Sequence, residues 1–136
     1  MDARAATAAG GAALLGLLLS GCGAGAARVD GARDAGRAFG RALALRDYAA
    51  ACALLAPDTR AQVEADEKRA CRPALEAQEL TPPGKVRTVE VYGRQALVRA
   101  EGQTLFLSQF AGGWLVVAAG CTPRSDGPHR CVVKGG

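Results

Sequence analysis

The sequence predicts an α+β fold in which N-terminal helices pack on one face of a four-stranded antiparallel meander. Apolar residues recur at helical spacing before the breaker Thr81-Pro82-Pro83-Gly84 and alternate with polar residues after it. The later segments are joined by short links that contain glycine, so neighbouring strands are expected to run antiparallel. Helices followed by strands, rather than alternating with them, are typical of α+β domains.

Four helices are predicted in the first part of the chain. They span 27–46, 48–56, a short segment that ends near 64, and 70–79. Asp47 is placed to cap the second helix, and Asp58 or Thr59 the third. Pro57 ends the second helix, while Pro73 is compatible only with the first turn of the fourth.

Four strands are predicted after the breaker. They span 85–92, 95–100, 103–110 and 114–119. Gly112-Gly113 is a strong signal for a hairpin. The residues after 119 include Pro123 and Pro128 and are expected to form a loop. Helices that cover one face of such a sheet leave room for a cavity between the two layers.

The first 21 residues have the pattern of an export signal. A short polar start precedes the apolar stretch 12–19, which is too short to span a hydrocarbon core of about 30 Å. The segment Leu19-Ser20-Gly21-Cys22 resembles the lipobox of bacterial lipoproteins. The resemblance implies cleavage between Gly21 and Cys22, a diacylglycerol group on the Cys22 thiol, and a fatty acyl chain such as palmitate on the new amine. Two or more acyl chains are enough for stable anchoring.

This interpretation divides the chain into three parts. Residues 1–21 form a lipoprotein signal peptide, 22–29 a lipidated flexible tether, and 30–134 a single α+β domain. The expected location is the extracytoplasmic face of the cell membrane, where the lipid on Cys22 holds the domain. The alternative is an ordinary cleaved leader followed by an incidental cysteine.

Four cysteines lie in the part of the chain that is expected to be exported. An even number in an exported chain indicates disulfide bonds, and three pairings are possible. We favour Cys52–Cys71 and Cys121–Cys131, because each pair closes a short loop within one local unit. Zinc binding is the rival interpretation, but the spacings are not CxxC and His129 is the only histidine.

The charge of the chain gives no case for nucleic-acid binding. The 17 Lys and Arg residues exceed the 13 Asp and Glu residues by only four, for a formal net charge of +4. No run of basic residues and no basic stripe interleaved with aromatic residues is present in the sequence. We therefore predict the membrane lipid on Cys22 as one partner and no nucleic acid.

Aromatic residues are few, and most of them are candidates to line a cavity. These candidates are Phe39, Tyr48, Phe106, Phe110 and Trp114. His129 has only Asp126 nearby in sequence to orient it, and Ser108 has no GxSxG context. The sequence therefore predicts no catalytic residue, no metal site and no cofactor.

The C-terminal part carries a further resemblance. The segment 118–123, AAGCTP, precedes a proline-containing loop and the end 131–136, CVVKGG. Together with 48–57, YAAACALLAP, and the helical segment around Cys71, it resembles a group of uncharacterised lipoproteins from high-GC Gram-positive bacteria. That group is expected to have a tyrosine near the position of His129. These motifs are structural and imply no particular chemistry.

The order of the elements is also similar to a known architecture. Helices followed by a meander resemble the NTF2-like, cystatin-related cone of SnoaL-type and limonene-hydrolase-type proteins. The resemblance implies a cavity for a small apolar ligand and, in some members, a buried Asp or His that acts in catalysis. Fold alone does not define function.

The sequence is compatible with three functions. The first is a non-enzymatic module that binds a small apolar ligand or an envelope protein. The alternative is a SnoaL-like enzyme acting on a small hydrophobic molecule. The third is a structural envelope protein without a ligand.

Overall fold

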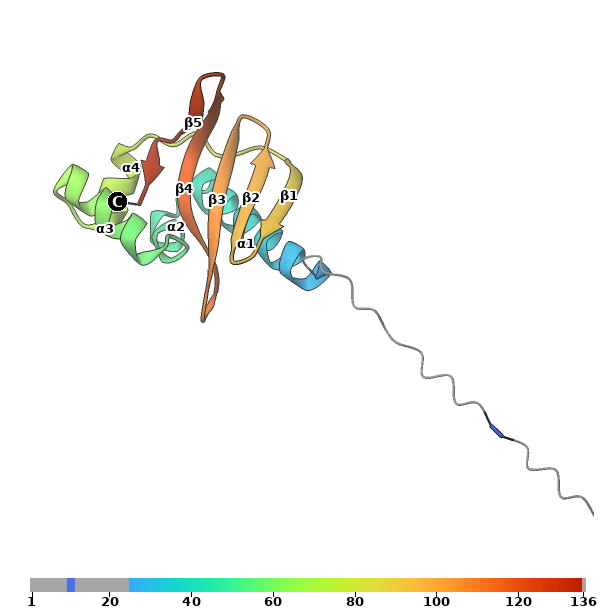
Figure 1. Ribbon diagram of the computed structural model, residues 1–136. Coiled ribbons are helices and arrows are strands. Elements are labelled where there is room, and N and C mark those ends of the chain that lie inside the picture. Colours follow the sequence, from blue (N-terminus) through green and yellow to red (C-terminus); the bar gives the residue numbers. More distant parts are fainter. Residues whose placement is uncertain (1–9, 12–24, 136) are drawn as a thin grey trace, which may run out of the picture.

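The computed structural model describes residues 10–11 and 25–135 and confirms the α+β class (Figure 1). Its helices are α1 (Ala26–Ala44), α2 (Tyr48–Ala53), α3 (Pro57–Glu67) and α4 (Cys71–Ala77). Its strands are β1 (Val86–Tyr92), β2 (Gln95–Ala100), β3 (Gln103–Phe110), β4 (Gly113–Arg124), β5 (Gly127–Arg130) and β6 (Val133–Lys134). The predicted cleavage and lipidation sites, Gly21 and Cys22, lie outside the described residues.

The sheet is an open antiparallel meander with more strands than the sequence predicts. Its order is β1-β2-β3-β4-β5, and β6 pairs with β4 beside this path. The prediction of four strands is wrong because β4 continues to Arg124, and β5 and β6 form from the expected loop. Pro123 and Pro128 made that segment resemble a loop. Both lie in the β4–β5 ribbon, where the register shifts between Thr122 and Arg124. Irregular ribbons of this kind tolerate proline, which has no N–H to donate.

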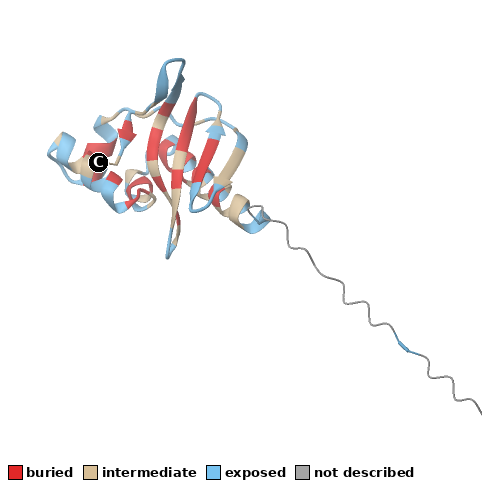
Figure 2. Cartoon of the chain, in the orientation of Figure 1, coloured by how far each residue is buried: buried red, intermediate tan, exposed pale blue. Residues whose placement is uncertain are grey.

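α1 covers one face of the sheet (Figure 1). Its buried residues recur every three or four positions, as an amphipathic helix requires. Gly36 allows a close approach, because a Cβ at this position would lie 3.2 Å from Cγ1 of Val98. Phe39 is fully buried on the same helix. Figure 2 shows the buried positions gathered in α1, the middle strands and the adjoining helices. The layers are therefore tightly packed around these positions.

The other helices lie beside β4 instead of on the sheet face (Figure 1). The N–H of Val116 donates to the carbonyl of Leu54 at 2.8 Å, and the N–H of Ala56 donates to the carbonyl of Val116 at 2.8 Å. The hydroxyl of Thr59 donates to the carbonyl of Val117 at 3.0 Å. α2 and α3 are thus joined to the backbone of β4. Of the predicted helices only α1 packs across the sheet, because the link between α2 and α3 uses hydrogen-bonding groups of β4.

The helix ends agree with the sequence in part. The Asp47 carboxylate caps α2 by accepting a hydrogen bond from the Ala50 N–H at 3.1 Å, as predicted. α3 begins earlier than predicted, with Ala56 at its N-cap, so neither Asp58 nor Thr59 caps it. α3 also continues past 64 to Glu67, and Lys68 then ends it with a φ of 52°.

One buried polar side chain connects the breaker to the sheet. Gln103 donates through Nε2 to the carbonyl of Thr81, and its Oε1 accepts from the N–H of Gly120 at 2.7 Å. Gly120 has a φ of 65°, and a Cβ there would lie 2.8 Å from Cδ2 of Leu80. Glycine is therefore required at this point. Among the described residues, no buried side-chain nitrogen or oxygen lacks a hydrogen-bond partner.

Candidate functional site

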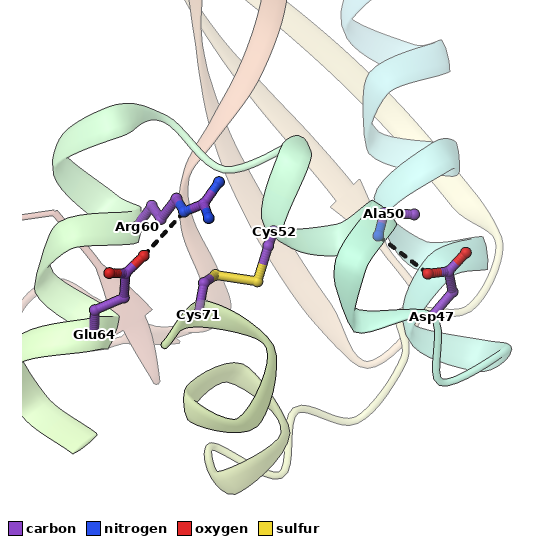
Figure 3. Close-up of a disulfide and its surroundings, with 6 residues drawn as sticks. All are labelled: Asp47, Ala50, Cys52, Arg60, Glu64 and Cys71. Atoms are coloured by element: carbon purple, nitrogen blue, oxygen red, sulfur yellow. Dashed lines mark hydrogen bonds and ion pairs between the residues drawn. A yellow bond between two sulfur atoms is a disulfide. The ribbon is translucent and has the colours of Figure 1, made fainter. Parts of the chain in front are cut away.

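Both predicted disulfide bonds are present (Figure 3 shows the first). Cys52–Cys71 joins α2 to the first residue of α4, with 6.1 Å between the Cα atoms. Cys121–Cys131 joins β4 to the residue after β5. The zinc interpretation is therefore wrong, because all four sulfurs are bonded in pairs. Disulfides persist in oxidising compartments, which indicates an extracytoplasmic location.

No described helix has both the length and the apolar character needed to cross a bilayer.

A polar hollow of about 650 Å³ lies beside the first disulfide. It is bounded by the turn between α1 and α2, by α3 and by the start of α4. Its lining consists of Arg46, Asp47, Tyr48, Arg60, Ala70, Cys71, Arg72, Pro73 and Glu76. We call this site the arginine-lined hollow, because three arginines from three different segments meet around it.

Two of these arginines are held by exposed ion pairs. Arg46 lies 3.1 Å from the Glu76 carboxylate, and Arg60 lies 2.9 Å from the Glu64 carboxylate. Arg72 forms no ion pair with any carboxylate in the described part of the chain. Exposed ion pairs contribute at most about 1 kcal/mol to stability. A ligand can therefore displace these carboxylates at little cost.

Local structure fixes the walls of the arginine-lined hollow. Arg46 adopts a φ of 55°, which turns the chain sharply between α1 and α2. The next residue, Asp47, caps α2 (Figure 3). The Cys52–Cys71 bond then holds α4 against α2 and brings Arg72 to the same side. Figure 3 shows the side chain of Arg60 extending from α3 toward this junction.

A second, more apolar hollow of about 460 Å³ lies between the start of α3, the end of β3 and the middle of β4. Its lining consists of Ala56, Pro57, Asp58, Thr59, Ser108, Phe110, Val117 and Gly135. The only ionisable side chain in this lining is that of Asp58. We call this site the apolar hollow.

The structure separates the aromatic residues that the sequence groups together. Tyr48 lines the arginine-lined hollow, and Phe110 lines the apolar hollow. Phe39 is fully buried, and Trp114 is 8% exposed in the core. Phe106 is partly buried and meets the ring of His129 edge-on, with 5.2 Å between the ring centres. The five residues therefore do not surround one common cavity.

The sequence contained no signal for the arginine-lined hollow. Arg46, Arg60 and Arg72 are separated by many residues, and they belong to a chain with 17 basic residues. Only the tertiary arrangement of the α1–α2 turn, α3 and α4 brings these three together. The Cys52–Cys71 disulfide and the Asp47 cap were the parts of this region that the sequence predicted.

The described residues thus form a small α+β domain with two disulfides, and the arginine-lined hollow and the apolar hollow lie on its surface. No protein-family model, no curated protein and no solved structure matches the chain. The resemblance to lipoproteins of high-GC Gram-positive bacteria therefore stays a prediction from the residues themselves.

Proposed function

We propose that the chain is an exported lipoprotein whose domain acts as a non-enzymatic binding module at the outer face of a membrane. The main support for this proposal is that Cys22 has a different sequence context and role from the other four cysteines. Cys52, Cys71, Cys121 and Cys131 pair with one another in the domain. Cys22 is left over, and it follows an apolar stretch and two small residues, as a lipidation site does.

The first prediction concerns this anchor. Cys22→Ala is expected to move the protein from the membrane fraction to the soluble or secreted fraction, because the thiol that takes the lipid is absent. Fractionation of cells followed by immunodetection measures the change. Ser20→Ala is the matched control, since it keeps a small residue next to the cleavage site and should leave the protein in the membrane fraction. Equal membrane retention of Cys22→Ala and the wild type would contradict the proposal.

We infer that the arginine-lined hollow binds an anionic group. Guanidinium groups pair with carboxylates and phosphates through two parallel hydrogen bonds, which favours planar or tetrahedral oxyanions. Three arginines face two lining carboxylates, Asp47 and Glu76, so the lining carries a net positive charge. Arg72 is the arginine with no carboxylate to displace, and it should contribute most to binding.

The second prediction tests this site with inorganic phosphate. Titration followed by NMR is expected to shift amide signals around Arg72 and Tyr48, and Arg72→Ala should weaken binding by about fivefold or more, equivalent to about 1 kcal/mol. Arg87→Ala is the matched control, because Arg87 is an exposed, ion-paired arginine of β1. Equal affinities of the two variants would show that the hollow has no specific role.

The apolar hollow is the candidate site for a second class of ligand, a small apolar molecule. Its largely apolar lining suits the small apolar ligand implied by the resemblance to the NTF2-like cone. We retain this cone as the finer description of the fold, supported by the order of helices and meander and by the cover that α1 provides. A short fatty alcohol, titrated in the same NMR experiment, should shift signals around Phe110 and Val117. Shifts confined to other parts of the domain would contradict this assignment.

The enzymatic alternative has less support. A SnoaL-like mechanism requires a buried ionisable side chain within a ligand cavity. In the described chain, the buried polar side chains outside the disulfides are Thr59, Gln103 and Thr104, and none of these ionises near neutral pH. We therefore favour binding, to a ligand or an envelope protein, over catalysis.

A further inference from the structure

One end of the domain brings together the start of α1 and two turns of the sheet. Gln109 connects all three segments. Its Oε1 accepts a hydrogen bond from Nη2 of Arg28 at 3.4 Å, in the first turns of α1. Its carbonyl accepts one from Nη2 of Arg94 at 2.9 Å, in the turn between β1 and β2. Its own N–H donates to the carbonyl of Arg94 at 2.8 Å. In Figure 1 these segments share the lower end of the domain.

Two exposed aromatic side chains lie at this end. Tyr92 ends β1 and is 63% exposed, and Phe110 ends β3 and is 37% exposed. Each ring flanks a hairpin turn. Aromatic side chains with an apolar body are favoured at the boundary between water and lipid, where the headgroups lie.

The charges at this end favour anions. Neither Arg28 nor Arg94 pairs with a carboxylate of the described residues. The nearby carboxylate of Glu90 already accepts a hydrogen bond from the Tyr92 hydroxyl at 2.7 Å and lies 2.9 Å from Arg99. These two interactions, the tyrosine bond first, lower the pKa of Glu90 and keep it paired. Arg28 and Arg94 each use part of the guanidinium group to bind Gln109, but no carboxylate of the described residues neutralises their charge. The remaining N–H groups of both can therefore bind a negatively charged surface.

The chain between Cys22 and α1 is too short to let this end move far from a lipid anchor. α1 begins at Ala26, only four residues after Cys22. Four residues span at most about 14 Å when fully extended. If Cys22 carries lipid, as the proposed function has it, the start of α1 is held within that distance of the headgroups. The two turns that Gln109 connects to α1 are then on the membrane side of the domain.

We propose that this end of the domain docks on an anionic membrane surface. We call it the anchor-proximal end and define it by Arg28, Tyr92, Arg94 and Phe110. The rings of Tyr92 and Phe110 enter the headgroup region, and the guanidinium groups of Arg28 and Arg94 bind lipid phosphates. The lipid then acts as more than a tether, because docking fixes the orientation of the whole domain on the membrane. This inference rests on the proposed lipoprotein function.

The test uses variants of the mature chain, 22–136, that all carry Cys22→Ala, so neither the lipid nor the apolar leader contributes to binding. Each is mixed with phosphatidylcholine vesicles that contain about one third phosphatidylglycerol, and the bound fraction is measured by flotation. We expect Tyr92→Ser/Phe110→Ser to lower the partition coefficient by about tenfold. The matched control is Leu45→Ser/Val132→Ser, which changes the other two large exposed apolar residues of 25–135 and should bind like the parent. Melting curves verify that both variants remain folded.

The outcomes separate this inference from the proposed function. Arg28→Ala/Arg94→Ala, high salt or vesicles of phosphatidylcholine alone should weaken binding, because anionic lipid attracts the arginines. The docking inference would be overturned if Tyr92→Ser/Phe110→Ser and Leu45→Ser/Val132→Ser partition equally, or if the parent does not bind. Neither result would contradict the proposal that Cys22 is lipidated. Failure of the anchor itself is detected independently by the fractionation of Cys22→Ala.

Discussion

Phe39→Ala is expected to lower the free energy of unfolding by about 3–5 kcal/mol. Phe39 is fully buried on α1 and belongs to the main hydrophobic core. Without the ring, the fold loses the free energy gained by transferring the ring from water to the core. The substitution also leaves a cavity that the close-packed neighbours cannot fill. Urea denaturation followed by circular dichroism measures the change.

Phe110→Ala is the control for this substitution. It removes the same ring from a site that is 37% exposed, so the loss should be clearly smaller. The comparison also distinguishes a core residue from a residue that lines a ligand cavity. Equal losses for Phe39→Ala and Phe110→Ala would mean that Phe39 does not have the buried position described above.

Replacement of both Cys52 and Cys71 with alanine is expected to cost about 3 kcal/mol of stability. The bond closes a loop with a sequence separation of 19 and restricts the unfolded chain. For a domain of this size, the loss corresponds to a fall in Tm of roughly 10 °C. The same variant should bind phosphate more weakly, because α4 is no longer held against α2 beside the arginine-lined hollow.

The Cys121→Ala/Cys131→Ala variant separates stability from binding. Its loop is shorter, with a sequence separation of 10, and the expected stability loss is of similar size. Its disulfide lies at the end of β4, so phosphate affinity should stay close to that of the wild type. Calorimetry of both variants, with and without phosphate, measures the two effects. Weakened phosphate binding in both variants to the same degree would contradict the assigned site.

Local patterns predicted the elements that depend on short-range signals. The spacing of apolar residues identified α1, although it places the helix one residue late, at 27 instead of Ala26. The Asp47 cap and the proline in the first turn of α4 follow from simple backbone chemistry. The first three strands match because alternation and glycine turns define them within the segment itself. The predicted tether 22–29 extends into α1, whose first residues are helical.

Longer-range effects account for what the sequence did not reveal. β6 has only two residues, and no periodicity can be recognised in so short a strand. Its pairing depends on the position of β4, where Val133 faces Ala119. The lateral position of α2 and α3 depends likewise on hydrogen bonds to Val116 and Val117.

At the candidate site, too, short-range features were predicted and long-range ones were not. The disulfide next to it was predicted correctly, since loop length and cysteine count are properties of the sequence. The convergence of Arg46, Arg60 and Arg72 arises only when the α1–α2 turn, α3 and α4 pack together. The aromatic residues were grouped by rarity, and rarity does not determine which side chains share a surface. Phe39 and Phe110 consequently have quite different environments.

Lipidation of Cys22 and the presence of two disulfides are tested most directly by the intact mass of the protein extracted from membranes, measured before and after reduction. We expect a chain that begins at Cys22, carries fatty acyl chains there, and gains the hydrogens of two reduced disulfides on treatment with a thiol. Recovery from the cytosol of a full-length chain, Met1 to Gly136, with an unmodified Cys22 and free thiols would contradict both export and lipidation.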